Sequence, residues 1–96
     1  MNVYVVYLTR QAEADNEKLK KSGNQQLERK AAELIQLLRE DPRRDYPPVK
    51  RLNGDLKGLW ARRLNEQHRL VYRIDDDDGD EKAVVVVSMW THYHKK

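Results

Sequence analysis

A proline-rich segment separates the chain into two halves with different periodicities, and this limits the folds that the chain can adopt. Pro42, Pro47 and Pro48 all lie in the stretch EDPRRDYPP. Proline has no backbone N–H, and it disfavours helix both at its own position and at the residue before it. We therefore expect an extended, irregular link here, with any preceding helix ending near Pro42.

The half before the link predicts one strand and two helices. Residues 2–8 (NVYVVYL) are rich in β-branched and aromatic side chains, which favour a strand. Thr9 is a suitable cap for a polar helix that runs to about Lys21 and ends near Gly23. Within residues 25–39, apolar side chains recur at spacings of three and four, so they share one face of a second helix. These side chains belong to Leu27, Ala31, Leu34, Ile35 and Leu38.

The half after the link predicts three strands. Apolar and basic residues alternate over residues 59–64, the stretch NEQ supplies a turn, and residues 68–74 form a second strand. The acidic stretch DDDDGDE lacks the ligand spacing of an EF-hand and is expected to be a solvated loop. A third strand should run from Ala83 to about Tyr93.

The predicted order of strand, helix, helix and three strands indicates an α+β fold. The two helices should pack on one face of an antiparallel sheet, which leaves the other face available for function. With 96 residues, the chain has room for one domain over residues 1–96.

Composition excludes several classes of protein. The longest strongly apolar run, residues 83–87, is far shorter than the roughly 20 residues of a membrane span. No signal peptide opens the chain, so we expect a cytoplasmic protein that does not bind membranes. Cysteine is absent, which excludes a thiolate metal site and a cysteine nucleophile.

Basic residues are concentrated in the middle of the chain. Residues 43–73 contain nine of them against three acids, and such a field attracts polyanions. In the stretch LWARRLNEQHRLVYRI, Arg62 and Arg63 should point to opposite faces of one strand, while Arg69 and Arg73 share one face of the next. This pattern indicates a phosphate or nucleic-acid site. The alternative is that the arginines lie at sheet edges with their aliphatic stems on apolar neighbours.

The final stretch, THYHKK, contains the remaining candidates for chemistry. On a straight strand His92 and His94 would share a face, but zinc usually needs three or four protein ligands and the only other histidine is His68. We therefore predict no metal. A histidine beside a tyrosine and several guanidinium groups suits proton transfer at a phosphodiester. In metal-free RNA cleavage a base takes the 2′-hydroxyl proton, cations stabilise the charge on phosphorus, and an acid protonates the leaving 5′-oxygen.

The stretch LKGLWARRLNEQHRLVYRI, followed by a hydrophobic strand and HY, resembles the YoeB/Txe branch of the RelE-like bacterial toxins. The match is nearly complete over residues 56–74 and weaker, though consistent in order, elsewhere. The resemblance implies a RelE-like fold and a ribosome-dependent, metal-independent mRNA endonuclease of a type II toxin–antitoxin module. It implies a cognate antitoxin, the ribosome with its rRNA and mRNA as partners, and no cofactor. Whether the free toxin forms a homodimer stays open.

The resemblance also assigns roles to residues. By it, Arg69 stabilises the scissile phosphate, His92 is the general acid, and Tyr93 orients the substrate. Arg62 and Arg63 match paired arginines that would contact RNA or the ribosome. We expect the same kind of contact from the other basic residues near these positions, which are Arg51, Arg73, Lys95 and Lys96.

The chain departs from the family pattern at the position of the general base. The family has a glutamate ten residues before the tryptophan, and Lys50 stands there. A lysine accepts a proton only in its neutral form, which neighbouring cations such as Arg51 would favour. Asp45 or Glu66 are alternative bases.

Two further departures lie near the end of the chain. Trp90 replaces an arginine that is frequent in the family, and the chain continues past Tyr93, where relatives often end. The loss of the family glutamate favours an alternative, an inactive member of the fold: a gyrase inhibitor similar to ParE, or a protein that only binds the ribosome or antitoxin. A plain nucleic-acid-binding module is a third possibility.

Overall fold

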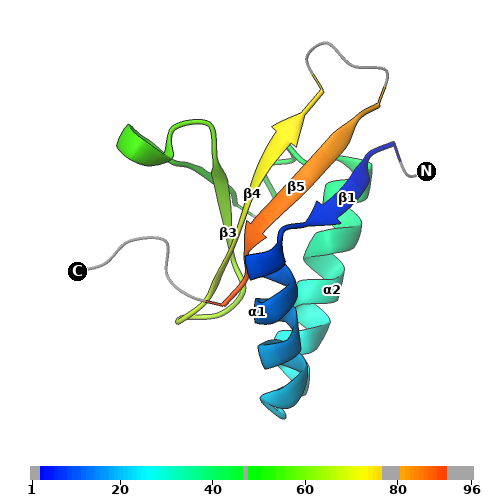
Figure 1. Cartoon of the computed structure of the whole chain (residues 1–96), viewed down its shortest axis with the longest axis vertical. Helices are drawn as coiled ribbons and strands as arrows, with labels where there is room; N and C mark the ends of the chain where they lie inside the picture. The colour runs from blue at the N-terminus through cyan, green and yellow to red at the C-terminus, as the bar shows by residue number, and fades with distance from the viewer. Residues whose placement is uncertain (1–2, 47, 77–80, 91–96) are drawn as a thin grey trace.

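A computed structural model describes residues 3–46, 48–76 and 81–90. Two helices cover one face of a five-stranded sheet whose strand order is β1-β5-β4-β3-β2 (Figure 1). The elements are β1 (Val5–Leu8), α1 (Arg10–Lys21), α2 (Gln25–Glu40), β2 (Lys50–Arg51), the short 3-10 helix η1 (Gly54–Leu56), β3 (Trp60–Arg63), β4 (Arg69–Asp75) and β5 (Ala83–Ser88). The predicted α+β architecture, with both helices on one face, is confirmed.

Both helices begin at capping residues. The Thr9 hydroxyl accepts a hydrogen bond from the Ala12 N–H at 3.1 Å, and the Asn24 side chain accepts one from the Leu27 N–H at 3.0 Å. These bonds satisfy backbone donors that have no partner within the helix. Between the helices Gly23 has a φ of 76°, a conformation that glycine adopts without strain. The predicted helix boundaries are therefore confirmed to within one or two residues.

The main core lies between the helices and the sheet. Alternation along each strand sends one set of side chains toward the helices, where they meet the apolar face of α2. The most deeply buried members are Ala12, Leu19, Leu38, Leu70, Tyr72, Val84, Val86 and Met89. Within the described ranges, no helix is long and apolar enough to span a membrane.

The sheet differs from the prediction in two respects. β1 pairs with β5 in parallel, from Val5 opposite Ala83 to Leu8 opposite Val86, whereas the other pairs are antiparallel. The expectation of a wholly antiparallel sheet is wrong here, because no short turn joins these two strands and so none sets their direction. The second difference is β2, a two-residue strand that pairs with Trp60 and Ala61 at the far edge.

The second face of the sheet is covered in part. Leu52, Ala61 and Val71 are buried there, and Leu56 and Leu59 pack on them from the segment that contains η1. This segment projects from the sheet on the side away from the helices (Figure 1). The predicted open face is therefore limited to the part of the sheet that this second cluster does not cover.

The last strand ends earlier than predicted. β5 stops at Ser88, and the Met89 N–H donates a hydrogen bond to Oδ2 of Asp15 on α1 at 2.9 Å. Asp15 is fully buried and also accepts a bond from Gln11 at 2.8 Å. The expected alternation along one straight strand is therefore wrong at Met89 and Trp90, because a helix side chain takes up the Met89 backbone donor. The segment 91–96 lies outside the described residues.

A hydrogen-bonded network ties the proline-containing link to the end of β4. Arg43 donates from Nη1 and Nη2 to the two carboxylate oxygens of Asp76 at 2.9 and 3.2 Å. The Tyr4 hydroxyl donates to Asp76 Oδ2 at 2.7 Å. The hydrogen bonds from Arg43 and Tyr4 lower the pKa of Asp76 from 3.8 to about 2. The network therefore requires the carboxylate in its charged form.

We predict that this network makes stability depend on pH in acid. Because the pKa of Asp76 is depressed in the folded state, its contribution is complete above the ordinary value of 3.8 and is lost as pH falls toward about 2. Thermal unfolding followed between these pH values should show a steeper loss of stability than in Asp76→Asn. Asp75→Asn is the control, because Asp75 is exposed and its ion pair with the exposed Arg73 is long, at 3.7 Å. Equal pH dependence in the parent chain and Asp76→Asn would contradict the prediction.

Candidate active site

A pocket of about 250 Å³ lies where β2, β3 and β4 meet on the face of the sheet away from the helices. The register pairs Lys50 with Ala61 and Arg63 with Arg69, so all four side chains share one face. The pocket is lined by Pro48, Val49, Lys50, Ala61, Arg63 and Arg69. The structure thus brings together three of the predicted site residues, each with a cationic side chain.

The turn between β3 and β4 orients Arg69. Nη1 of Arg69 donates to the carbonyls of Asn65 at 3.2 Å and His68 at 3.3 Å. Within the described chain these bonds use only one of the guanidinium nitrogens, which leaves Nε and Nη2 as donors for an anion. The hydrogen bonds of Nη1 therefore fix Arg69 to the turn, while its other nitrogens stay available as donors for a phosphate.

Asn65 organises the turn and was not singled out from the sequence. Its side-chain oxygen accepts hydrogen bonds from the N–H groups of Gln67 and His68, both at 2.8 Å. Asparagine is typical of turns because its side chain bonds to the backbone two residues later. That property, at the start of the predicted turn NEQ, is the signal that could have identified Asn65 as the residue that shapes the Arg69 site.

Trp90 packs beside the same turn. Its ring stacks on that of His68 with the centroids 4.2 Å apart, and the Lys18 ammonium lies 6.0 Å from the Trp90 ring centre. The last described residue therefore lies next to the turn that holds Arg69. His92, Tyr93, Lys95 and Lys96 lie outside the described residues, so their roles stay predictions.

Arg62 lies in the interior, and the prediction that it contacts RNA is corrected. Its side chain is 1% exposed, with Nε donating to the Tyr72 hydroxyl at 3.1 Å and Nη2 donating to the carbonyls of Pro42 and Arg44. The Tyr72 hydroxyl donates in turn to the Pro42 carbonyl at 2.7 Å. Burial raises the pKa of Tyr72, and the adjacent Arg62 charge opposes that rise. Because Arg62 points toward the helices, it binds the link instead of a ligand.

Arg51 does not lie beside Lys50 in the pocket. It pairs with Trp60 in the register, and its guanidinium carbon is 5.0 Å from the Trp60 ring centre, in a cation–π contact. Neighbouring residues of a strand point to opposite faces, so the cations that share the pocket with Lys50 are Arg63 and Arg69.

The other predicted residues lie around the pocket or away from it. Arg73 is on the same face of β4 as Arg69 and is 3.7 Å from Asp75. Asp45 and Glu66, the alternative bases, are exposed and do not line the pocket. Within residues 3–46, 48–76 and 81–90, no three or more histidine, aspartate or glutamate side chains gather in a way that could hold a metal ion.

The sequence as a whole matches a known family. Residues 8–93 match the YoeB-like toxins of bacterial type II toxin–antitoxin systems. The chain belongs to this family. Toxin YoeB of Mycobacterium bovis is 40% identical over 50 residues, which are 52% of this chain and 59% of that toxin. The aligned part of the chain thus spans about three fifths of that YoeB relative.

Solved structures extend the YoeB likeness over nearly the whole chain. A YoeB/ParE toxin from Agrobacterium tumefaciens has a TM-score of 0.79 at 26% identity, over 92% of this chain and 98% of that chain. A YoeB–YefM complex from Staphylococcus aureus gives 0.74 at 26% identity, over 94% and 98%. The RelE-like fold expected of a YoeB toxin is therefore confirmed.

We predict that Arg62 stabilises the fold, whereas the adjacent Arg63 contributes surface charge and little stability. Arg62→Met removes the Arg62 donor from the Arg44 carbonyl and leaves the Pro42 carbonyl with the bond from the Tyr72 hydroxyl, so the free energy of unfolding should fall by about 1–3 kcal/mol. Arg63→Met removes an exposed side chain and should change it by less than about 0.5 kcal/mol. Urea unfolding of both variants measures the difference. Equal losses would contradict the distinct placement of the two side chains.

Proposed function

We propose that this chain is the toxin of a type II toxin–antitoxin module and cleaves mRNA in the ribosomal A site without a metal. The observation that carries the proposal is the pocket in which Lys50, Arg63 and Arg69 share one face of the sheet. A phosphodiester needs this kind of environment, because negative charge develops on its oxygens during cleavage. Membership of the YoeB-like family supports the same activity.

The proposed reaction is attack of a ribose 2′-hydroxyl on the adjacent phosphodiester. The 2′-oxygen forms a bond to phosphorus while the bond from phosphorus to the 5′-oxygen breaks. Neutral Lys50 takes the 2′-hydroxyl proton, and His92 gives a proton to the leaving 5′-oxygen. Arg69 stabilises the charge on the phosphate oxygens through Nε and Nη2, and Tyr93 orients the substrate. The upstream product carries a 2′,3′-cyclic phosphate. Attack of water on its phosphorus breaks the bond to the 2′-oxygen and leaves a 3′-phosphate.

The proposed partners are the ribosome with its rRNA, mRNA and an antitoxin. Arg51, Arg63, Arg73, Lys95 and Lys96 would contact RNA, and an activity on translating ribosomes requires a cytoplasmic location. Staphylococcus aureus YoeB was solved both with YefM and as a dimer, which supports an antitoxin and a homodimer as partners of this chain. Because the pocket is basic, the antitoxin segment that binds it should be acidic.

Arg69 provides the first test of the activity. Arg69→Ala should reduce cleavage of ribosome-bound mRNA by at least about tenfold, since it removes a charge-stabilising group from the transition state. Arg73→Ala is the matched control on the same strand face, outside the pocket, and should have a smaller effect. Primer extension on mRNA from a purified translation system measures the cut. No cleavage by the parent chain would refute the proposed activity.

Lys50 provides a test of the proton acceptor. Lys50→Met cannot take a proton and should lower the cleavage rate at least about tenfold. Lys50→Glu supplies the carboxylate that the family has at this position and should retain activity, with a shifted pH dependence. Single-turnover rates across pH would distinguish the two variants. Full activity of Lys50→Met would show that Lys50 is not the base.

The alternative is a member of the fold that binds without cutting RNA, such as a gyrase inhibitor. Lys50 in place of the family glutamate is the observation that favours it. DNA supercoiling by gyrase in the presence of the protein tests this alternative. Inhibited supercoiling together with uncut ribosomal mRNA would establish it over the endonuclease.

A further inference from the structure

β5 ends at a β-bulge on Val87. The neighbouring residues Val71 and Tyr72 of β4 pair with β5 residues that are two positions apart, which leaves Val87 between them without an opposite residue. A bulge bends its strand and changes the direction of the side chains that follow. The chain after Val87 therefore leaves the straight path of β5, and contacts from outside the sheet have to fix it.

Helix α1 and its cap supply these contacts. The hydroxyl of Thr9, the capping residue, donates to the Val87 carbonyl at 2.9 Å. On α1 itself, Oδ2 of Asp15 accepts a hydrogen bond from the Met89 N–H at 2.9 Å. The two bonds take the place of a strand ladder at the bulge, so the position of α1 determines the path of the backbone at Met89.

The carboxyl group of Asp15 binds neutral groups in the core. Its side chain is fully buried, which is costly for a polar group, and its two donors are the Met89 N–H and the Gln11 amide. An apolar side chain would avoid this cost but would leave the buried Met89 N–H without its acceptor. The role of Asp15 is therefore to fix the backbone of Met89.

The next residue along the chain, Trp90, contacts the turn that holds Arg69. The Trp90 ring stacks on the His68 ring, with the centroids 4.2 Å apart and an angle of 27° between the planes. The His68 carbonyl accepts hydrogen bonds from the Asn65 N–H and from Nη1 of Arg69, both at 3.3 Å. One residue thus carries both the stacked ring and the carbonyl that orients the guanidinium.

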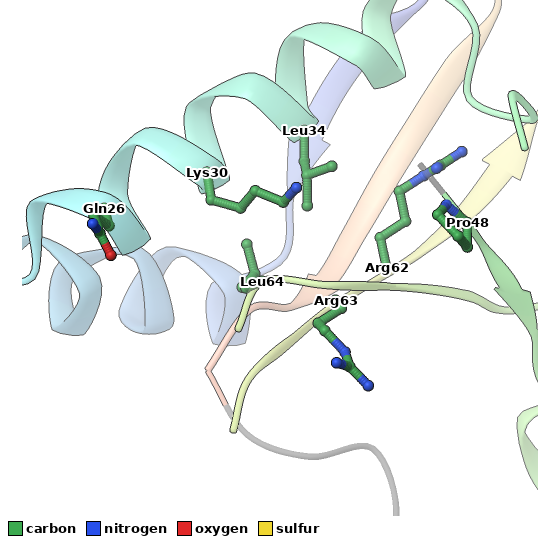
Figure 2. Close-up of a pocket in the computed structure, with 7 residues that line it drawn as sticks. All are labelled: Gln26, Lys30, Leu34, Pro48, Arg62, Arg63 and Leu64. Carbon is green, nitrogen blue, oxygen red and sulfur yellow. The ribbon is translucent and has the colours of Figure 1, made fainter. Parts of the chain in front are cut away.

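The α2 side of this turn is less tightly packed. A pocket of about 650 Å³ lies between α2 and β3, with Leu34 and Leu64 as apolar walls and Lys30 beside them. Leu64 points toward Leu34 and Lys30, whereas Arg63 points away from α2 (Figure 2). Since this pocket leaves space between the turn and α2, the ring stack beside α1 is the tighter restraint on the turn.

We propose that Asp15 is a positioning residue for the candidate active site. By binding the Met89 N–H it holds Trp90 against His68, and the stacked His68 keeps its carbonyl where it orients Arg69. Asp15 itself contacts no substrate. The inference rests on the proposed function, in which Arg69 stabilises the charge on the phosphate. A misplacement of about 1 Å is enough to slow such a reaction, because the stabilisation depends on geometry.

Leu19→Ala separates this role from a contribution to stability alone. Leu19 is 1% exposed on the same helix and belongs to the same core as Met89. Its truncation leaves a cavity and destabilises the fold, but it keeps the bond from the Met89 N–H to Asp15. All variants are compared at a temperature at which circular dichroism shows them folded.

The first measurement is the position of His68 against Trp90, which NMR reports without any assay of activity. An aromatic ring shifts the signals of protons over its face upfield, so the imidazole C–H signals of His68 should be shifted in the parent chain. His68→Gln identifies these signals. Asp15→Ala should remove the shift. Asp15→Asn, whose side-chain oxygen can still accept from the Met89 N–H, and Leu19→Ala should keep it.

The second measurement is the single-turnover rate of mRNA cleavage on ribosomes at saturating protein. Asp15→Ala should lower this rate at least about tenfold and leave the half-saturating concentration nearly unchanged, because it displaces a group that acts in the transition state. Asp15→Asn and Leu19→Ala should stay within about threefold of the parent chain. Trp90→Leu removes the stack, keeps Asp15 and should be as slow as Asp15→Ala. Since both changes act through one contact, the double variant should be no slower than the slower single variant.

Several results would overturn the inference. These are an unchanged His68 signal in Asp15→Ala, a rate in Asp15→Asn or Leu19→Ala as low as that of Asp15→Ala, or a parental rate in Trp90→Leu. Should Asp15→Ala fail to fold, Trp90→Leu and Asp15→Asn decide between the two roles. Uncut mRNA with the expected His68 shifts would refute the endonuclease and leave the coupling of Asp15 to His68 standing. Equal cleavage by the parent chain and Asp15→Ala would do the reverse.

Discussion

The buried guanidinium of Arg62 is the interaction on which the arrangement of the candidate site depends. It joins three parts of the chain, because it comes from β3, contacts the Tyr72 hydroxyl on β4, and donates to carbonyls of the link at Pro42 and Arg44. A buried charge is tolerated only where hydrogen bonds replace water, and here backbone carbonyls take that place. The link so held leads to Pro48 and Lys50, which form one wall of the pocket.

The neighbouring Arg63 has the opposite environment, because its side chain is exposed on the face of the sheet away from the helices. Its side chain lines the pocket that holds Lys50 and Arg69, and it also borders the apolar pocket beside α2.

The pocket could be anticipated from the sequence in part. The predicted hairpin places Arg63 and Arg69 on adjacent strands, the family signature includes both, and Lys50 stands where the family has its glutamate. The sequence did not distinguish Arg62 from Arg63 as buried and exposed, because alternation predicts opposite faces without saying which face meets the helices. Asn65 and Asp15 were also missed. Asn65 bonds to the backbone of its own turn. Asp15 bonds to the N–H of Met89, which lies 74 residues after it in the chain.

The sequence by itself determined the two helices, β1, the hairpin of β3 and β4, the basic character and the membership of the YoeB-like family. Those features depend on local periodicity, capping and composition, which neighbouring residues encode. Only the tertiary structure decided that β1 runs parallel to β5, that β5 ends at Ser88, and that Arg51 lies on Trp60 instead of beside Lys50. These features arise from contacts between residues far apart in the chain, where packing and the pairing of buried polar groups outweigh local preference.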